Sequence, residues 1–150
     1  MRAARTGSCT ILALDMSGKN VDSFKRAAEA FSRRDLDAML AELDPDVEWH
    51  PGLAAFLAGE ATVYRGHEGV RGLVRDLDEH FAAFDNVYSE IRDLGDVVLA
   101  LGHSHARGKA SGTEIVSSMA FVVDFKDGKA VRVRTYLDPD KALTALRLSE

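Results

Sequence analysis

The sequence has little cysteine, no excess of positive charge and no long apolar run, and each shortage excludes a class of protein. The one cysteine, Cys9, cannot form an internal disulfide, which favours a reducing compartment, so we expect a cytoplasmic protein. Nineteen basic residues against 24 acidic ones give a formal net charge of −5, which argues against a nucleic-acid partner. The apolar run from Thr10 to Leu14 ends at Asp15 and is too short for a signal peptide, and we expect no membrane partner.

What remains is the composition of an ordinary globular domain. A chain of 150 residues with 46% hydrophobic residues can bury about two thirds of its unfolded surface, so it needs neither a disulfide nor a metal to fold. Residues 1–19 lack any periodicity that would tie them to a core. We predict that they form a disordered N-terminal arm, with the true start at either Met1 or Met16, and that 20–150 is a single domain.

The first half of the chain is predicted to be mainly helical. Apolar residues from Phe24 to Phe31 recur at helical spacing, and a shorter helix through Leu36 and Leu43 should end before Pro45. Residues 46–50 are predicted to form a short strand, and 53–64 a loop over a pocket mouth. A third helix from about residue 65 is indicated by an apolar stripe at Val70, Leu73, Val74, Leu77, Phe81 and Phe84.

The second half alternates with period two, which predicts four antiparallel strands. Two of them cover 86–93 and 97–107, and the other two meet at Lys126-Asp127-Gly128-Lys129, where Asp-Gly between apolar segments is a strong hairpin signal. The first hairpin arm has an almost wholly apolar face, which the earlier helices must cover. A short helix after Asp138 completes the chain. Helices segregated from antiparallel strands indicate an α+β fold.

Three separated motifs resemble a known superfamily. They are DVEWHPG at 46–52, YRGHEGVRGL at 64–73 and FKDGKAVRVRTYLDPDKAL at 125–143. In this order they are similar to the SnoaL-like polyketide cyclase group of the NTF2-like, or ketosteroid-isomerase-like, superfamily, over about residues 21–146. The resemblance implies a cone-shaped, curved antiparallel sheet wrapped around three N-terminal helices, the cystatin-like α+β barrel. It also implies an apolar internal pocket and commonly a homodimer through the outer sheet face. Because this fold serves many reactions, function must be argued from the site.

The resemblance also assigns roles to positions, and this chain departs from them. Where steroid isomerases place a carboxylate base before a proline, this chain has His50, and histidine can act as a base near neutral pH. Where they place an oxyanion-stabilising acid, it has Ser117, a weaker neutral donor. The epoxide hydrolase relatives carry a carboxylate where this chain has Thr135, so that reaction is not expected.

Two functions therefore stay open at the level of sequence. One is an isomerase or cyclase that abstracts a proton next to a carbonyl, with His50 as the catalytic base and Ser117, helped by His103 or His105, polarising the oxygen. The other is a non-catalytic ligand-binding or dimerisation module, in which the segment around His50 lines the pocket without chemistry. A convergence of His50 and a second polar group on one empty volume would separate the two.

The expected partner is a small hydrophobic or polycyclic carbonyl compound. His103 and His105 point to one face of their strand, as a metal site would need, and His50 is a conceivable third ligand. No carboxylate or cysteine stands beside them at a spacing typical of a metal site, so we predict no metal and no cofactor. Which parity of strand 97–107 faces the pocket is left open. The aromatic and apolar candidates can equally be core residues, and Asp138 can equally cap the last helix. The candidate ligand-binding residues are Trp49, Phe56, Tyr64, His103, His105, Ser117, Met119, Phe121, Thr135 and Asp138.

Overall fold

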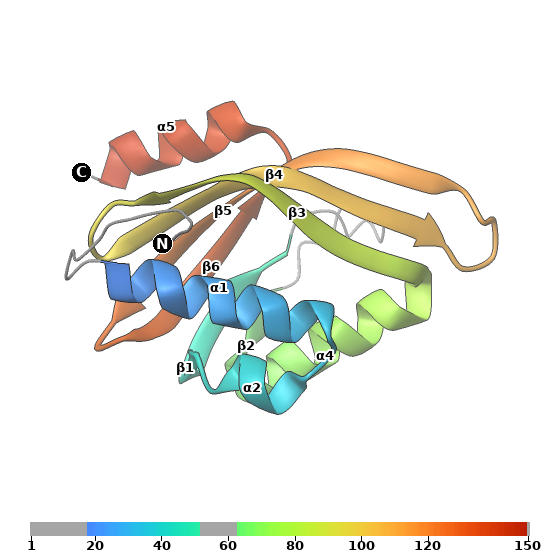
Figure 1. Ribbon diagram of the computed structural model, residues 1–150, viewed down its shortest axis with the longest axis horizontal. Coiled ribbons are helices and arrows are strands. Elements are labelled where there is room, and N and C mark those ends of the chain that lie inside the picture. Colours follow the sequence, from blue (N-terminus) through green and yellow to red (C-terminus); the bar gives the residue numbers. More distant parts are fainter. Residues whose placement is uncertain (1–17, 52–62, 150) are drawn as a thin grey trace, which may run out of the picture.

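The computed structural model describes residues 18–51 and 63–149, in which helices pack against one curved sheet (Figure 1). In chain order the elements are α1 (Gly18–Ser32), α2 (Leu36–Leu40), β1 (Leu43–His50), β2 (Tyr64–Arg65), α4 (Gly66–His80), β3 (Phe81–Asp93), β4 (Val97–Gly108), β5 (Glu114–Lys126), β6 (Lys129–Tyr136) and α5 (Pro139–Ser149). The predicted α+β fold with a curved sheet is confirmed. Most of the predicted arm, and Phe56, lie outside the described residues, and the last two residues of the predicted arm, 18 and 19, belong to α1.

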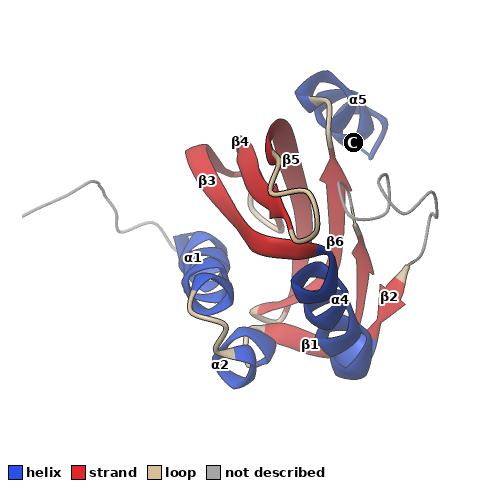
Figure 2. Cartoon of the chain, turned by 90° about the vertical axis from the view of Figure 1, so that its right-hand side faces the viewer, coloured by secondary structure: helices blue, strands red, loops and turns tan. Residues whose placement is uncertain are grey.

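The sheet has six strands in the order β2-β1-β6-β5-β4-β3. Neighbouring strands are antiparallel except β1 and β6, which run parallel. The prediction of an antiparallel sheet therefore holds for every neighbouring pair except this one. In Figure 2 the sheet bends from β3 and β4 round to β1 and β2, with α1, α2 and α4 on its inner side. Helix α5 packs on the opposite, outer side, where it covers Leu99, Ala120 and Val122 (Figure 1).

The hairpin between β5 and β6 forms where Asp-Gly predicted it. Lys126 pairs with Lys129, and the two residues between them have positive φ angles, 53° at Asp127 and 80° at Gly128. Positive φ at both central residues is the requirement of a type I′ turn, whose twist matches that of the two strands. The turn therefore fixes the register by which β5 and β6 line the inner face.

The boundary between α4 and β3 differs from the prediction. The apolar stripe was expected to keep Phe81 and Phe84 in the helix, but the helix ends at His80 and both residues lie in β3. Phe81 pairs with Gly108 and Phe84 with Ala106, so hydrogen bonding to β4 overrides the local helical spacing. Both rings still face the core, with centroids 5.4 Å apart. Leu43 likewise begins β1 rather than ending α2.

A close backbone contact accompanies an irregularity in β3. The register of β3 against β4 shifts between Tyr88 and Glu90, beside Gly102 of β4. A Cβ added at Gly102 would lie 2.0 Å from the carbonyl oxygen of Val87, so only glycine allows the two strands to approach in this way. A bulge bends the strand that carries it. The bend turns the middle of β3 towards α1.

The main hydrophobic core lies between the helices and the inner face of the sheet. Phe24, Val70 and Met119 are among its buried members, and Met119 has no exposed surface. On the outer face, the parts of β3 and β5 away from α5 leave Val87 and Val116 exposed. No helix in the described ranges is long and apolar enough to cross a membrane.

Candidate functional site

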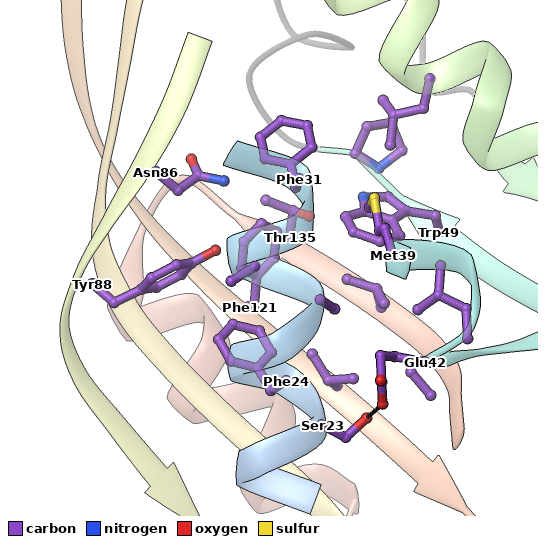
Figure 3. Close-up of a pocket in the computed structure, with 18 of the residues that line it drawn as sticks. Ser23, Phe24, Phe31, Met39, Glu42, Trp49, Asn86, Tyr88, Phe121 and Thr135 are labelled. Carbon is purple, nitrogen blue, oxygen red and sulfur yellow. Dashed lines mark hydrogen bonds between the residues drawn. The ribbon is translucent and has the colours of Figure 1, made fainter. Parts of the chain in front are cut away.

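A cavity lies between α1 and the inner face of the sheet (Figure 3). The volume open to the centre of a water molecule is about 90 Å³, several times the roughly 10–15 Å³ that a single water requires. Aromatic rings form much of its wall, since Trp49 and Phe24 both pack edge-on against Phe121, at centroid distances of 6.1 and 6.3 Å. Such a wall suits an apolar ring compound better than a chain of waters.

One side of the cavity carries a chain of hydrogen bonds. Asn86 and Ser104 are register partners on β3 and β4, so their side chains share the inner face, and Ser104 Oγ donates to Asn86 Oδ1 at 2.7 Å. Tyr88 lies two residues further along β3 on the same face. Burial raises the pKa of the Tyr88 phenol, a hydrogen bond with the Asn86 side chain partly opposes the shift, and the Asp85 charge adds to it. The phenol is therefore neutral at all ordinary pH values and keeps a proton to donate.

Thr135 adds an unsatisfied polar atom to the same cavity. Its Oγ1 is buried and has no hydrogen-bond partner among the residues that the structure describes. Thr135 is the register partner of Phe121, so it faces inwards from β6 beside the aromatic wall. In Figure 3 the Tyr88 ring extends from β3 towards the space in which Thr135 also lies. A buried hydroxyl without a partner costs free energy that a bound hydrogen-bonding group would recover.

The carboxylate of Glu42, at the other end of the cavity, is already occupied. Ser23 Oγ donates to it at 2.8 Å, and the Arg26 guanidinium donates to its two oxygens at 2.9 and 3.0 Å. The hydrogen bonds from Arg26 hold the pKa of Glu42 below its usual value, with burial opposing and Ser23 adding to the shift. An anion stabilised in this way is a poor proton acceptor, and its contacts tie α1 to the start of β1.

Three of the predicted ligand-binding residues, Trp49, Phe121 and Thr135, line this cavity. His50 does not. It follows Trp49 on β1, so the alternation of the strand turns it to the opposite face, where its Nε2 lies 3.5 Å from Oε1 of Glu48. The next residue, Pro51, reaches the cavity instead. The geometry therefore gives no support to His50 as a base acting in this cavity.

The predicted oxygen-polarising group is not assembled either. The residues of β4 that face inwards are the small ones at even positions, and His103 and His105 are exposed on the outer face. Ser117 shares the face of its register partner Ser104 but lies outside the cavity, and its hydroxyl donates to the Ser118 carbonyl at 3.3 Å. These three side chains therefore do not converge on a common volume with His50.

The remaining candidates have structural surroundings. Met119 is fully buried in the main core. Tyr64 Oη donates to Asp76 at 2.7 Å, and the Tyr64 ring packs against a separate buried cluster, which consists of Leu73, Leu77, Phe81 and Ala106. Asp138 is exposed and accepts a hydrogen bond at 3.0 Å from the backbone N–H of Asp140, at the start of α5, as the capping alternative required. Within 18–51 and 63–149, no three potential metal-ligating side chains of His, Cys, Asp or Glu gather.

The sequence reasoning missed Asn86, Tyr88 and Ser104. A usable signal was present, because Asn86 and Tyr88 stand two apart at the start of a period-two segment and so share a face. Ser104 belongs to the parity of 97–107 with small side chains, and the sequence alone left open which parity faces the pocket. What was missing was the register that brings the two strands together.

Comparisons with known proteins agree with the architecture. The SnoaL-like domain family matches residues 24–133. No curated protein matches the chain. A crystal structure of an NTF2-like protein of unknown function from Burkholderia pseudomallei is 26% identical, with a TM-score of 0.73 over 84% of this chain and 95% of that one.

Two further solved structures share the fold at lower identity. The protein TerC, co-crystallised with polyporic acid, is 23% identical, with a TM-score of 0.71 over 84% of this chain and 96% of that one. A candidate polyketide cyclase from Xanthomonas campestris is 20% identical, with a TM-score of 0.66 over 85% of this chain and 96% of that one. The predicted NTF2-like fold is thereby confirmed.

Proposed function

The chain belongs to the SnoaL-like domain family, and from this premise we propose that its cavity binds a small, largely apolar ring compound that carries a carbonyl oxygen. The observation that carries the proposal is the buried, unpartnered hydroxyl of Thr135 in a cavity that also holds the neutral phenol of Tyr88. Two hydroxyl donors in a largely apolar enclosure match one acceptor oxygen on an apolar ligand.

The apolar part of the ligand is selected by the wall. Phe121 lies at the centre of a group of aromatic side chains, with Phe24, Trp49 and Tyr88 packed around it at centroid distances between 6.1 and 6.3 Å. Edge-to-face packing leaves ring faces and edges available to another ring. Charged ligands are disfavoured, because the described wall offers no unpaired charge and Glu42 is held by Arg26.

A matched pair of probes tests the proposal. 1-Tetralone and tetralin differ only in a carbonyl oxygen, so their affinities, measured by titration calorimetry or ligand-detected NMR, isolate the contribution of that oxygen. We expect the ketone to bind about 2- to 12-fold more tightly, the value of one net hydrogen bond.

Matched variants identify the donors. Tyr88→Phe and Thr135→Val each remove a hydroxyl and keep the shape, so the preference for the ketone should fall towards unity while tetralin binds as before. Ser118→Ala, on the exposed outer face, is the control and should leave the preference unchanged. Equal affinity of the wild-type protein for ketone and hydrocarbon would contradict the proposal.

A second candidate function is enolisation of the bound ketone, as an isomerase or cyclase would require. It is favoured by the Tyr88 phenol, which lines the cavity and can donate a hydrogen bond to a developing enolate. Neither His50, on the opposite face, nor Glu42, held by Arg26, is placed to accept the proton from the neighbouring carbon, so that proton would pass to water. Deuterium uptake at the carbon next to the carbonyl of 1-tetralone, followed by NMR in D₂O, tests it. Uptake above the buffer rate that is lost in Tyr88→Phe supports catalysis, and His50→Ala tests the predicted base. Uptake no faster than in buffer favours the non-catalytic ligand-binding module.

A further inference from the structure

A second depression, on the outside of the molecule, adjoins the cavity where α1 faces β3. Its volume open to the centre of a water molecule is about 400 Å³, and it is shallow and open to solvent. Three of its lining residues, Ala28, Asn86 and Tyr88, also line the internal cavity. The outer depression and the cavity therefore share these three residues in their walls.

The wall is thin at this point for a structural reason. β3 is an edge strand that pairs only with β4, so its other side faces α1 without backbone hydrogen bonds. Two aromatic pairs close the gap at its ends, Phe24 with Tyr88 at 5.2 Å and Phe31 with Phe84 at 6.3 Å between centroids. Between them, the α1 residue that lines both the cavity and the depression is Ala28, whose side chain is a single methyl group.

We propose that the cavity and the outer depression form one two-part site, connected between Ala28 and Asn86. An apolar ring occupies the cavity, and a substituent with a neutral hydrogen-bonding end passes out between α1 and β3. This inference rests on the proposed function, because it extends the proposed ligand from a compact ketone to a ketone with a long substituent. It assigns Asn86 a position at the junction, where its amide can contact the substituent.

The charges around the depression select the end of that substituent. Glu29 offers an acceptor, and Arg33 offers donors, although the Arg33 guanidinium also lies 3.8 Å from Asp35. The Ser32 hydroxyl is committed to Asp85, to which it donates at 2.8 Å. A hydroxyl can donate to Glu29 and accept from Arg33. A carboxylate gains from Arg33 alone and an ammonium from Glu29 alone, and each also meets a like charge at the other residue. A neutral hydroxyl is therefore the best fit.

The test compares 1-tetralone with three derivatives that carry the same three-carbon chain ending in a hydroxyl, a carboxylate or an ammonium group. We expect the hydroxyl derivative to bind at least threefold more tightly than 1-tetralone, and the two charged derivatives to gain less. Ala28→Leu should fill the gap and remove the gain. Because Ala28 also lines the cavity, the gain is measured in this variant as the ratio of its affinities for the hydroxyl derivative and for 1-tetralone, and that ratio should fall to about one. Lys25→Leu is the matched control, because it places the same new side chain on the exposed face of α1. This variant should preserve the gain in affinity from the hydroxyl chain.

A surface variant keeps the test decisive if Ala28→Leu folds poorly by circular dichroism. Arg33→Ala leaves the gap and the cavity intact and should reduce the gain from the hydroxyl. The two-part site is overturned if 1-tetralone binds with its dependence on Tyr88 but the hydroxyl gives no gain, or if the gain survives both variants. A preference for either charged derivative also overturns it. If 1-tetralone itself does not bind, the proposed function fails and the two-part site with it.

Discussion

At the scale of single residues, Glu42 joins the cavity floor to α1 and makes stability depend on pH. Its folded-state pKa is depressed, chiefly by the hydrogen bonds from Arg26, so its contribution is present above the ordinary carboxyl pKa and is lost as the pH falls through the depressed folded-state value. Glu42→Gln should lower the free energy of unfolding by about 1 kcal/mol at pH 7. Urea unfolding at pH 7 and pH 3 should show the difference shrinking at the lower pH.

The control for this prediction is a glutamate that makes few stabilising contacts. Glu68 has a 95% exposed side chain and only a 4.0 Å contact with Arg71, so Glu68→Gln should change stability little at either pH. A Glu42→Gln deficit that is as large at pH 3 as at pH 7 would show that the effect comes from packing and not from charge.

Thr135 provides a second prediction, in which removal of a buried hydroxyl does not lower the free energy of unfolding. Because its buried hydroxyl has no partner in the described structure, Thr135→Val should leave the free energy of unfolding unchanged or raise it by up to about 1 kcal/mol. Ser104→Ala is the matched comparison. It breaks the 2.7 Å bond to Asn86 and should cost about 1 kcal/mol. Thermal unfolding of both variants without ligand checks the pair, and a loss of 1 kcal/mol or more in Thr135→Val would mean that the hydroxyl has a partner.

At the scale of elements, two glycines should respond to alanine in opposite directions. Gly102→Ala places a Cβ against the Val87 carbonyl and must push β3 away from β4, at a cost of about 1–3 kcal/mol. Gly72→Ala in α4 meets only the end of the flexible Arg75 side chain, at 3.3 Å, and should stabilise the helix by up to about 1 kcal/mol. Chemical unfolding of both variants measures the signs. Equal changes in the free energy of unfolding in the two variants would show that β3 can accommodate a Cβ at Gly102 without being pushed from β4.

Elements whose signals are local could be predicted from the sequence, and those set by pairing could not. Asp127-Gly128 specifies its own turn, and the Val70–Leu77 stripe specifies its helix, because each depends on residues a few positions apart. Phe81 was assigned to the helix because its spacing fits, and only pairing with Gly108 makes it a strand. Which face of β4 points inwards depends on its register with β3 and β5, and the sequence of β4 alone does not determine that register.

The candidate site was predicted on two grounds. Trp49 and Phe121 were named as large apolar side chains and Thr135 as a position at which relatives carry a carboxylate, and all three line the cavity. His50 was named through resemblance to a catalytic position, but strand alternation turns it away from the cavity. A role assigned by resemblance carries the position of a residue and not the direction of its side chain.

At the scale of the whole molecule, we propose that the outer sheet face joins two copies of the chain. Helix α5 covers only part of this face, and Val87 and Val116 stay 56% and 61% exposed beyond it. His103 and His105 stand between them in register on β4, so the uncovered area is continuous across three strands. An exposed apolar area of this kind is typical of a contact between subunits.

Light scattering coupled to size-exclusion chromatography tests the pairing. We expect twice the 16.3 kDa mass of the chain, and a shift to the single mass in a Val87→Glu and Val116→Glu double variant. Leu94→Glu is the control, because Leu94 is also 49% exposed but lies in the turn after β3, outside this area. A wild-type protein that elutes at the mass of one chain would refute the pairing.

The parallel contact between β1 and β6 also sets the order in which the molecule can be made. Leu43 pairs with Ala130 and His50 with Arg134, so the strand that carries Trp49 has no partner but β2 until the last strand has left the ribosome. Joining segments so distant in the chain is slow compared with forming the local hairpins. The cavity wall, which includes Trp49 of β1 and Thr135 of β6, is complete only when these two strands have paired.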